Sequence, residues 1–207
     1  DKDLDWIEGL MKGWFEVKVR ARLGPDLGDD KVVVILGRIV RWTDRGIEYE
    51  ADPKHRKLIL EYFGFDEGSK SLSVNGSVEE DRDRDEEVLS GKEATGYRGV
   101  AARVNFLAMD CADIQYPAKE ACRDMANPTV GSWKKLKKIA RYLIGRKSLV
   151  WVFILQDGDV FWMRVFTDSD WAGCRVTRKS TSGGIVLIGR HCIKTWSSTQ
   201  GPLALSS

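Results

Sequence analysis

Two aspartates near the C-terminal end of the chain, Asp168 and Asp170, have the type and spacing that metal chemistry requires. They follow the apolar residues Val165 and Phe166, which favours a β-strand. Residues two apart on a strand point to the same face, so both carboxylates can approach one divalent cation. Carboxylate oxygens are ligands of Mg²⁺, and clustered carboxylates support phosphodiester hydrolysis with two metal ions. The alternative, which these residues alone favour, is a solvated turn after a strand.

The densest group of basic residues in the chain could form a second kind of site, a surface that binds a polyanion. Its members are Lys134, Lys135, Lys137, Lys138 and Arg141. Apolar residues at helical spacing lie between them, and Thr129 can cap the resulting helix, which is predicted over 129–145. A helix face with several cations and no anion can neutralise phosphates, giving salt-dependent binding without sequence preference. The alternative is an ordinary solvated helix face that keeps the protein soluble.

The charge distribution and composition narrow the class of protein. Residues 1–90 contain 15 basic and 22 acidic residues, whereas residues 91–207 contain 18 basic and 9 acidic residues. A polyanion is therefore expected to bind the second half. No apolar run approaches the length of a membrane span, so no membrane partner is expected. The four cysteines form no C-x-x-C pair, which favours reduced thiols in an intracellular protein over a zinc site.

The elements that must position these residues include both helices and strands. Amphipathic helices are predicted at 3–14 and 53–63. Strands are predicted at 15–20 and 32–36, and the apolar run at 32–36 indicates a buried strand. A hairpin turn is predicted at 42–46. Residues 66–95 are rich in glycine, serine and acidic residues and are predicted as a linker or exposed loop. Three helices are predicted to follow at 97–109, 113–125 and 129–145, and then strands at 149–155, 160–167, 183–188 and 192–197.

Four short motifs in the last part of the chain occur in a recognisable order. They are Ser169-Asp170-Trp171-Ala172-Gly173, Arg178-Lys179-Ser180-Thr181-Ser182-Gly183, Trp196-Ser197-Ser198 and Ala204-Leu205-Ser206-Ser207. In this order and spacing they resemble the start of the ribonuclease H domain in Pol polyproteins of copia-type LTR retrotransposons. Four upstream segments are similar to the connecting helices of that family: Tyr97-Arg98, Ala112-Asp113-Ile114, Asn127-Pro128-Thr129 and Arg141-Tyr142-Leu143-Ile144-Gly145.

The resemblance implies an α+β fold, with thumb- and connection-like helices and strands followed by a truncated ribonuclease H-like antiparallel sheet. Its segments would be the end of the reverse transcriptase (1–75), a charged linker (76–95), a helical connection (96–147) and the first strands of an incomplete ribonuclease H domain (148–207). Exposed edges and an uncovered face are expected for that sheet. The chain contains no Y-V-D-D polymerase motif, and it ends before the position of a glutamate that the family's nuclease site requires.

The resemblance also implies the roles of particular residues. By the family motif, Asp168 is the first catalytic carboxylate and metal ligand, and Asp170 is not. The complete site holds two Mg²⁺ ions, so the resemblance implies an incomplete site here, with weak metal binding and no RNA cleavage by this chain alone. Arg175, Arg178 and Lys179 would lie near the nucleic-acid backbone, where they would either contact phosphates or remain solvated.

The function that the resemblance implies belongs to a larger protein. The parent would be an enzyme that synthesises DNA on an RNA template and hydrolyses the RNA strand of RNA–DNA hybrids. This segment would bind the hybrid or another duplex, together with the rest of the Pol polyprotein, in a cytoplasmic particle or the nucleus. A different class of function is also open, since a decayed or repurposed copy can persist as a nucleic-acid-binding protein without catalysis.

Overall fold

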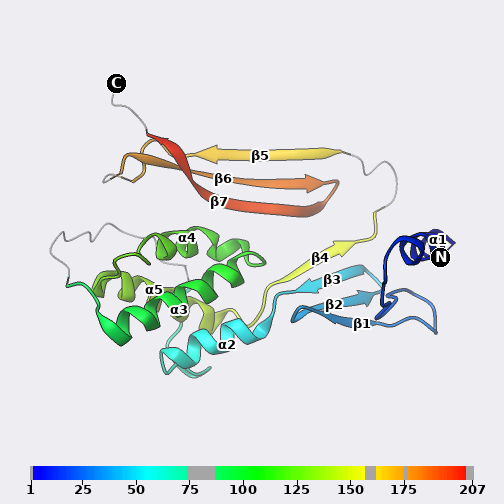
Figure 1. Ribbon diagram of the computed structural model, residues 1–207, viewed down its shortest axis with the longest axis horizontal. Helices are drawn as coiled ribbons and strands as arrows, with labels where there is room; N and C mark the ends of the chain where they lie inside the picture. The colour runs from blue at the N-terminus through cyan, green and yellow to red at the C-terminus, as the bar shows by residue number, and fades with distance from the viewer. Residues whose placement is uncertain (1, 74–86, 157–161, 175–176, 204–207) are drawn as a thin grey trace.

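The computed structural model describes residues 2–73, 87–156, 162–174 and 177–203 (Figure 1). Helices and two antiparallel sheets make up these residues, which confirms the α+β class. A layer of helices lies beside one sheet and beneath the other, with helix α4 facing the C-terminal sheet (Figure 1). In the described part of the chain, no helix is both long and apolar enough to cross a membrane.

The helical layer contains the main hydrophobic core. Its helices are α2 (Pro53–Tyr62), α3 (Gly91–Ala108), the 3-10 helix η1 (Ala112–Ile114), α4 (Gln115–Arg123) and α5 (Val130–Gly145). Tyr97, Ile114, Leu136 and Ile139 are almost completely buried where these helices meet. The predicted helices are thus confirmed, although α3 begins at Gly91 rather than at residue 97.

Two predicted helix starts have the capping that the sequence indicated. Thr129 Oγ1 accepts a hydrogen bond from the Ser132 amide at 3.1 Å, and Ser132 Oγ accepts one from the Thr129 amide at 3.2 Å. Asp52 Oδ1 accepts from the amide of Lys54 at 2.8 Å, one residue beyond Pro53. These bonds satisfy donors that have no partner within the first turn of a helix.

The first sheet has the order β1-β2-β3-β4. It consists of β1 (Val32–Ile35), β2 (Arg38–Thr43), β3 (Gly46–Glu50) and β4 (Val150–Ile154). Strand β4 pairs with β3, with Trp151 opposite Tyr49. The strand expected at 149–155, at the start of the segment 148–207, therefore extends the first sheet rather than the C-terminal one. The division of the chain into four segments stays a prediction.

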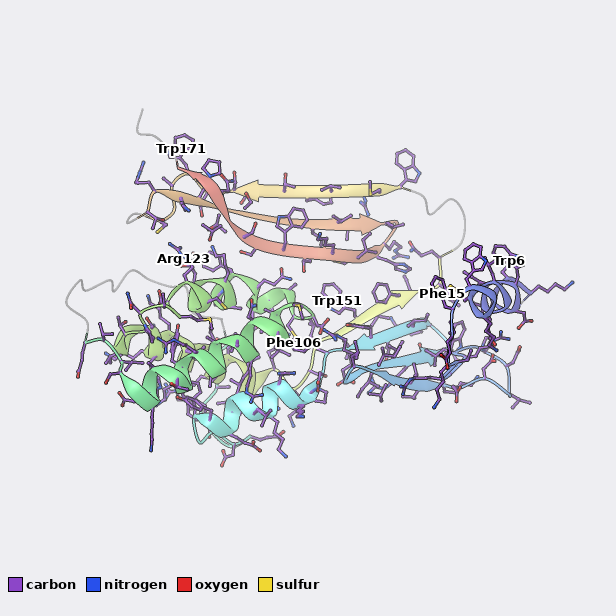
Figure 2. The ribbon with its side chains drawn as sticks, in the orientation of Figure 1. Trp6, Phe15, Phe106, Arg123, Trp151 and Trp171 are labelled. Carbon is purple, nitrogen blue, oxygen red and sulfur yellow. The ribbon has the colours of Figure 1, made fainter. Side chains whose placement is uncertain are left out.

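Two expectations for the N-terminal region were wrong. Strand β1 is not buried: it is an edge strand with β2 as its neighbour, and Val32, Val34 and Ile35 are exposed. Residues 15–20 alternate in polarity but form no strand, because no described strand pairs with them. The helix expected just before them is present as α1 (Lys2–Trp14), which buries none of its residues. Its Trp6 lies at the periphery of the molecule (Figure 2).

The C-terminal sheet has the order β5-β6-β7 and is antiparallel throughout. Its strands are β5 (Met163–Ser169), β6 (Lys179–Ile188) and β7 (His191–Leu203). All four strands predicted between residues 149 and 197 are thus confirmed, three of them in this sheet and β4 in the first sheet. Residues 74–86, 157–161, 175–176 and 204–207 lie outside the described residues, and with them most of the predicted linker 76–95.

Candidate nucleic-acid interface

Asp168 lies on β5, opposite Gly183 of β6, with its side chain exposed. Among the residues that the structure describes, no group of three or more histidine, cysteine, aspartate or glutamate side chains is placed to hold a metal ion. A two-ion site needs several carboxylates, since a single one leaves most coordination positions to water. The described residues therefore do not fit a resident pair of Mg²⁺ ions.

Asp170 has a local structural role at the end of β5. Its Oδ1 accepts hydrogen bonds from the amide of Gly173 at 3.0 Å and from the amide of Thr181 at 2.9 Å. Partial burial acts to raise the pKa of this carboxyl, but the two amide donors outweigh it and the pKa lies below its usual value. Asp170 thus joins the end of β5 to the start of β6, whereas Asp168 extends into solvent.

The basic face predicted on α5 is present. Lys134, Lys138 and Arg141 are exposed, and Lys135 and Lys137 are half-buried. The Lys137 ammonium lies 4.9 Å from the centre of the Trp133 ring, a cation–π distance that fixes its position on the helix surface. Within the described part of the chain, no carboxylate forms a salt bridge with any of these five cations. Within the described residues this face of α5 is therefore cationic.

The loop cations lie between β5 and β6. Arg178 is exposed and Lys179, the first residue of β6, is half-buried, whereas Arg175 lies outside the described residues. The Arg178 amide donates to the carbonyl of Cys174 at 2.7 Å, and the Cys174 amide donates to the carbonyl of Lys179 at 3.1 Å. Arg178 has a φ of 54°, in the left-handed region that non-glycine residues rarely adopt. Its backbone is therefore held in place by the turn.

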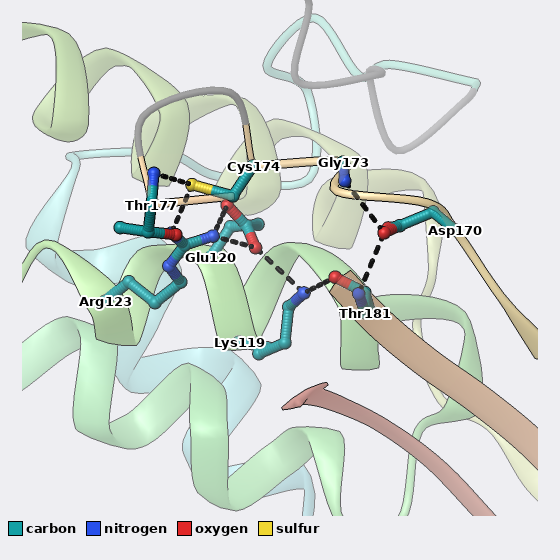
Figure 3. Close-up of polar contacts among 8 residues, drawn as sticks. All are labelled: Lys119, Glu120, Arg123, Asp170, Gly173, Cys174, Thr177 and Thr181. Atoms are coloured by element: carbon teal, nitrogen blue, oxygen red, sulfur yellow. Dashed lines mark hydrogen bonds and ion pairs between the residues drawn. The ribbon is translucent and has the colours of Figure 1, made fainter. Parts of the chain in front are cut away.

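Helix α4 contributes residues that the sequence analysis missed. Gln115, Lys119 and Arg123 are spaced four residues apart, so they lie on one face of the helix. Figure 2 shows Arg123 between α4 and the C-terminal sheet, and Figure 3 shows the contacts that Lys119 and Arg123 make there. The regular spacing of these long side chains was the sequence signal for a shared helix face. The sequence does not show which part of the molecule that face contacts.

Each of the three α4 side chains donates to a different part of the C-terminal sheet. Gln115 Nε2 donates to Thr195 Oγ1 of β7 at 2.9 Å, and Lys119 Nζ donates to Thr181 Oγ1 of β6 at 2.6 Å. Arg123 donates to Cys174 Sγ, in the connection after β5, at 2.8 Å. The helix therefore contacts the sheet at three successive positions.

Glu120 balances the charge of these cations. Its carboxylate lies 2.9 Å from Lys119 Nζ and 3.1 Å from an Arg123 guanidinium nitrogen, and the side chains of Lys119 and Glu120 are each only 12% exposed. Burial acts to raise the pKa of Glu120, but Lys119 and Arg123 outweigh it and lower the pKa below its usual value. The carboxylate is therefore ionised at neutral pH.

A groove of about 730 Å³ runs between the helical layer and β7. It is lined by residues of α3 and α4 on one side and by residues 193–199 of β7 on the other. Its charged lining residues are Lys119, Arg123 and Lys194, all of them cationic. The described residues thus carry positive charge on α5, in the β5–β6 connection and along this groove.

About half of the chain is similar to proteins of plant transposons. Over 104 residues, 50% of the chain, it is 35% identical to a retrovirus-related Pol polyprotein from transposon RE2 of Arabidopsis thaliana and 36% identical to the one from transposon RE1. An uncharacterized mitochondrial protein of Arabidopsis thaliana is 30% identical over 106 residues, 51% of the chain. No protein-family model matches the chain, and no solved structure does.

These similarities define the relatives of the chain. The chain is related to the retrovirus-related Pol polyproteins of copia-type transposons, as its motifs indicated. The alignment spans 7% of each Pol polyprotein and 43% of the mitochondrial relative. About half of the chain is thus similar to a small part of each Pol polyprotein.

Proposed function

We propose that this chain is a segment of a retrotransposon Pol polyprotein and that it binds an RNA–DNA hybrid or another nucleic-acid duplex. The observation that carries the proposal is the face of α5, where five cations lie without a described carboxylate partner. Such a face releases counterions from a phosphate backbone, which supplies affinity without reading the base sequence. Arg178 and Lys179 add a second, smaller contact.

Catalysis belongs to the larger protein in this proposal. The parent would carry out RNA-directed DNA synthesis and hydrolysis of the RNA strand in hybrids. Asp168 would be one carboxylate of the nuclease site, and the rest of the polyprotein would supply the others. By itself the chain is expected to bind Mg²⁺ weakly and not to cleave RNA, because one carboxylate does not hold two divalent ions.

Charge reversal on α5 tests the binding proposal. A variant carrying Lys134→Glu, Lys135→Glu and Lys138→Glu should bind a hybrid more weakly, and the slope of log affinity against log salt should fall by about 3 because each phosphate contact contributes about one unit. Fluorescence anisotropy with a labelled hybrid at several salt concentrations measures both quantities. Unchanged affinity in the triple variant would refute the α5 interface.

The matched control reverses three exposed lysines in the acidic half of the chain, with Lys12→Glu, Lys18→Glu and Lys54→Glu. It changes the net charge equally, so any loss of affinity that it shares with the α5 variant is a general charge effect. A cleavage assay in Mg²⁺ or Mn²⁺ tests the separate expectation that this chain does not cleave RNA by itself. Turnover by this chain that Asp168→Asn abolishes would contradict the expectation that it is inactive alone.

A further inference from the structure

The described residues of the connection between β5 and β6, which are 170–174 and 177–178 and are called the turn below, are joined by hydrogen bonds that main-chain amides donate. Besides the bonds of Asp170 and Cys174, the Ala172 amide donates to Ser180 Oγ at 3.0 Å, and both residues are buried. The Thr177 amide donates to Cys174 Sγ at 3.4 Å. Figure 3 shows the Thr177 bond to Cys174 and the bonds of Asp170 to Gly173 and Thr181. The conformation of Arg178 therefore depends on residues 170–174 and 177–181 keeping these partners.

Helix α4 holds this turn from outside at two points. Arg123 donates to Cys174 Sγ on one side of Arg178, and Lys119 donates to Thr181 Oγ1 on the other. Glu120 lies between the two cations and contacts both, so neither Lys119 nor Arg123 moves independently. The Lys119 contact to the Thr181 hydroxyl has a charged donor and a largely buried setting, which make it stronger than a neutral hydrogen bond. The Arg123 contact is weaker, because a thiol sulfur is a poor acceptor.

Besides these two contacts, the described part of the sheet is held by the bond from Gln115 to Thr195 and by His191, whose Nε2 lies 2.7 Å from the carbonyl oxygen of Ile154 in β4. Val165 and Phe166 of β5 are more than half exposed, and the buried residues of this region are Ala172, Cys174 and Ser180, all in or beside the turn. The burial of this part of the chain is thus concentrated where α4 contacts it. Apolar packing between sheet and helices is small, so directional polar contacts have a large share in setting their arrangement.

We propose that Lys119 and Arg123 are positioning residues, which hold the turn between β5 and β6 and thereby set where Arg178 and Lys179 meet a nucleic-acid backbone. The inference rests on the proposed function, since it concerns how the second phosphate contact is held. Lys119 and Arg123 act through Thr181 and Cys174. Rigid placement increases the affinity of a contact because less conformational freedom is lost on binding.

A neutral substitution on the acceptor side tests the proposal without changing charge. Thr181→Val removes the hydroxyl that accepts from Lys119 but keeps the β-branched shape and the amide that donates to Asp170. In the unaltered chain, Arg178→Ala should lower the salt slope of hybrid binding by about 1. With Thr181→Val in place, Arg178→Ala should change the slope by much less, because Arg178 no longer has a fixed position.

The unaltered chain, the two single variants and the double variant form a double-mutant cycle. This cycle separates the loop contact of the proposed function from the positioning role of Lys119. If Arg178→Ala has no effect on binding even with Thr181 intact, the loop contact of the proposed function fails. If it has the same effect with and without Thr181→Val, the loop contact stands and the positioning role is overturned. Thr181→Ser keeps the accepting hydroxyl and should behave as the unaltered chain; a loss equal to that of Thr181→Val would likewise overturn the role.

Hydrogen exchange provides a readout that needs no nucleic acid. Lys119→Met should accelerate amide exchange about tenfold around 179–183, because a charge-assisted bond to that strand is lost. Exchange in α5 and in β1–β3 should stay unchanged, and Lys119→Arg should restore protection. Lys134→Met, an exposed change on α5, is the control. Equal acceleration throughout the chain would show general destabilisation and would contradict a positioning role.

Discussion

The helical layer and the C-terminal sheet are stabilised in different ways. The main hydrophobic core is formed by residues between 51 and 144, and it is built where α2, α3, α4 and α5 meet. In the described part of the sheet region, the buried side chains are Ala172, Cys174 and Ser180, while large side chains such as Trp162 and Phe166 are exposed. Apolar burial thus dominates in the helices, and main-chain pairing with the α4 contacts dominates in the sheet. Substitutions of the same kind should have different effects in the two regions.

The largest effect is expected for a truncation in the helical core. Leu136 on α5 is 0% exposed, and Leu136→Ala removes buried methyl groups and leaves a cavity. The free energy of unfolding should fall by about 2–5 kcal/mol. Urea denaturation followed by circular dichroism measures the change.

The same kind of truncation in the sheet is the control for this comparison. Val165 on β5 is 52% exposed, so Val165→Ala should change the free energy of unfolding by no more than about 0.5 kcal/mol. Similar losses of unfolding free energy at Leu136 and Val165 would show that apolar burial stabilises the sheet as much as the helices. The contrast between the two regions would then be wrong.

An intermediate effect is expected where the first sheet joins the helices. Asp110, which follows α3 and is 10% exposed, accepts a hydrogen bond from Arg38 Nε and one from the Tyr49 hydroxyl, each at 2.8 Å. Asp110→Ala leaves the Arg38 cation without this partner in a largely buried place. The free energy of unfolding should fall by about 2–3 kcal/mol. Asp44→Ala, in an exposed hairpin turn, should change it little.

The ionisation of Tyr49 gives an independent readout of that junction. Burial, and then Asp110, raise the pKa of Tyr49 to about 12. Because Asp110→Ala removes the neighbouring carboxylate and leaves Arg38 nearby, the pKa should fall, which an NMR titration of the Tyr49 ring measures. A pKa that stays near 12 would mean that burial alone accounts for the shift.

The elements of the helical layer could be predicted from the sequence because their signals are local. On α5 the capping box at Thr129, the spacing of Leu136 and Ile139 and the cationic side all lie within one helix. The partner of β4 could not be predicted, because strand pairing over a long stretch of chain has no local signal. The exposure of β1 was missed for a related reason, since an apolar run does not distinguish a central strand from an edge strand.

The candidate site was predictable in its components and not in its arrangement. The motifs indicated Asp168, Arg178 and Lys179 by position alone. The local role of Asp170, which accepts from the Thr181 amide, depends on how β5 and β6 pair. The role of Lys119 also depends on how α4 packs against the sheet. Each of these contacts joins residues whose proximity exists only in the folded chain.

A smaller effect than at Asp110 is expected at Glu120, where helix α4 and the C-terminal sheet meet. Its pKa is lowered below the ordinary value of 4.5, so its ionised form stabilises the folded protein above that pH, and the stabilisation is lost as pH falls through the folded pKa. Glu120→Gln should therefore cost about 1 kcal/mol at about pH 7 and less at about pH 3. Urea denaturation at the two pH values measures the difference. Glu61→Gln, in an exposed pair with Lys57 on α2, is the matched control and should show no such pH dependence. A penalty for Glu120→Gln that persists in full at the lower pH would mean that shape, rather than charge, holds α4 against the sheet.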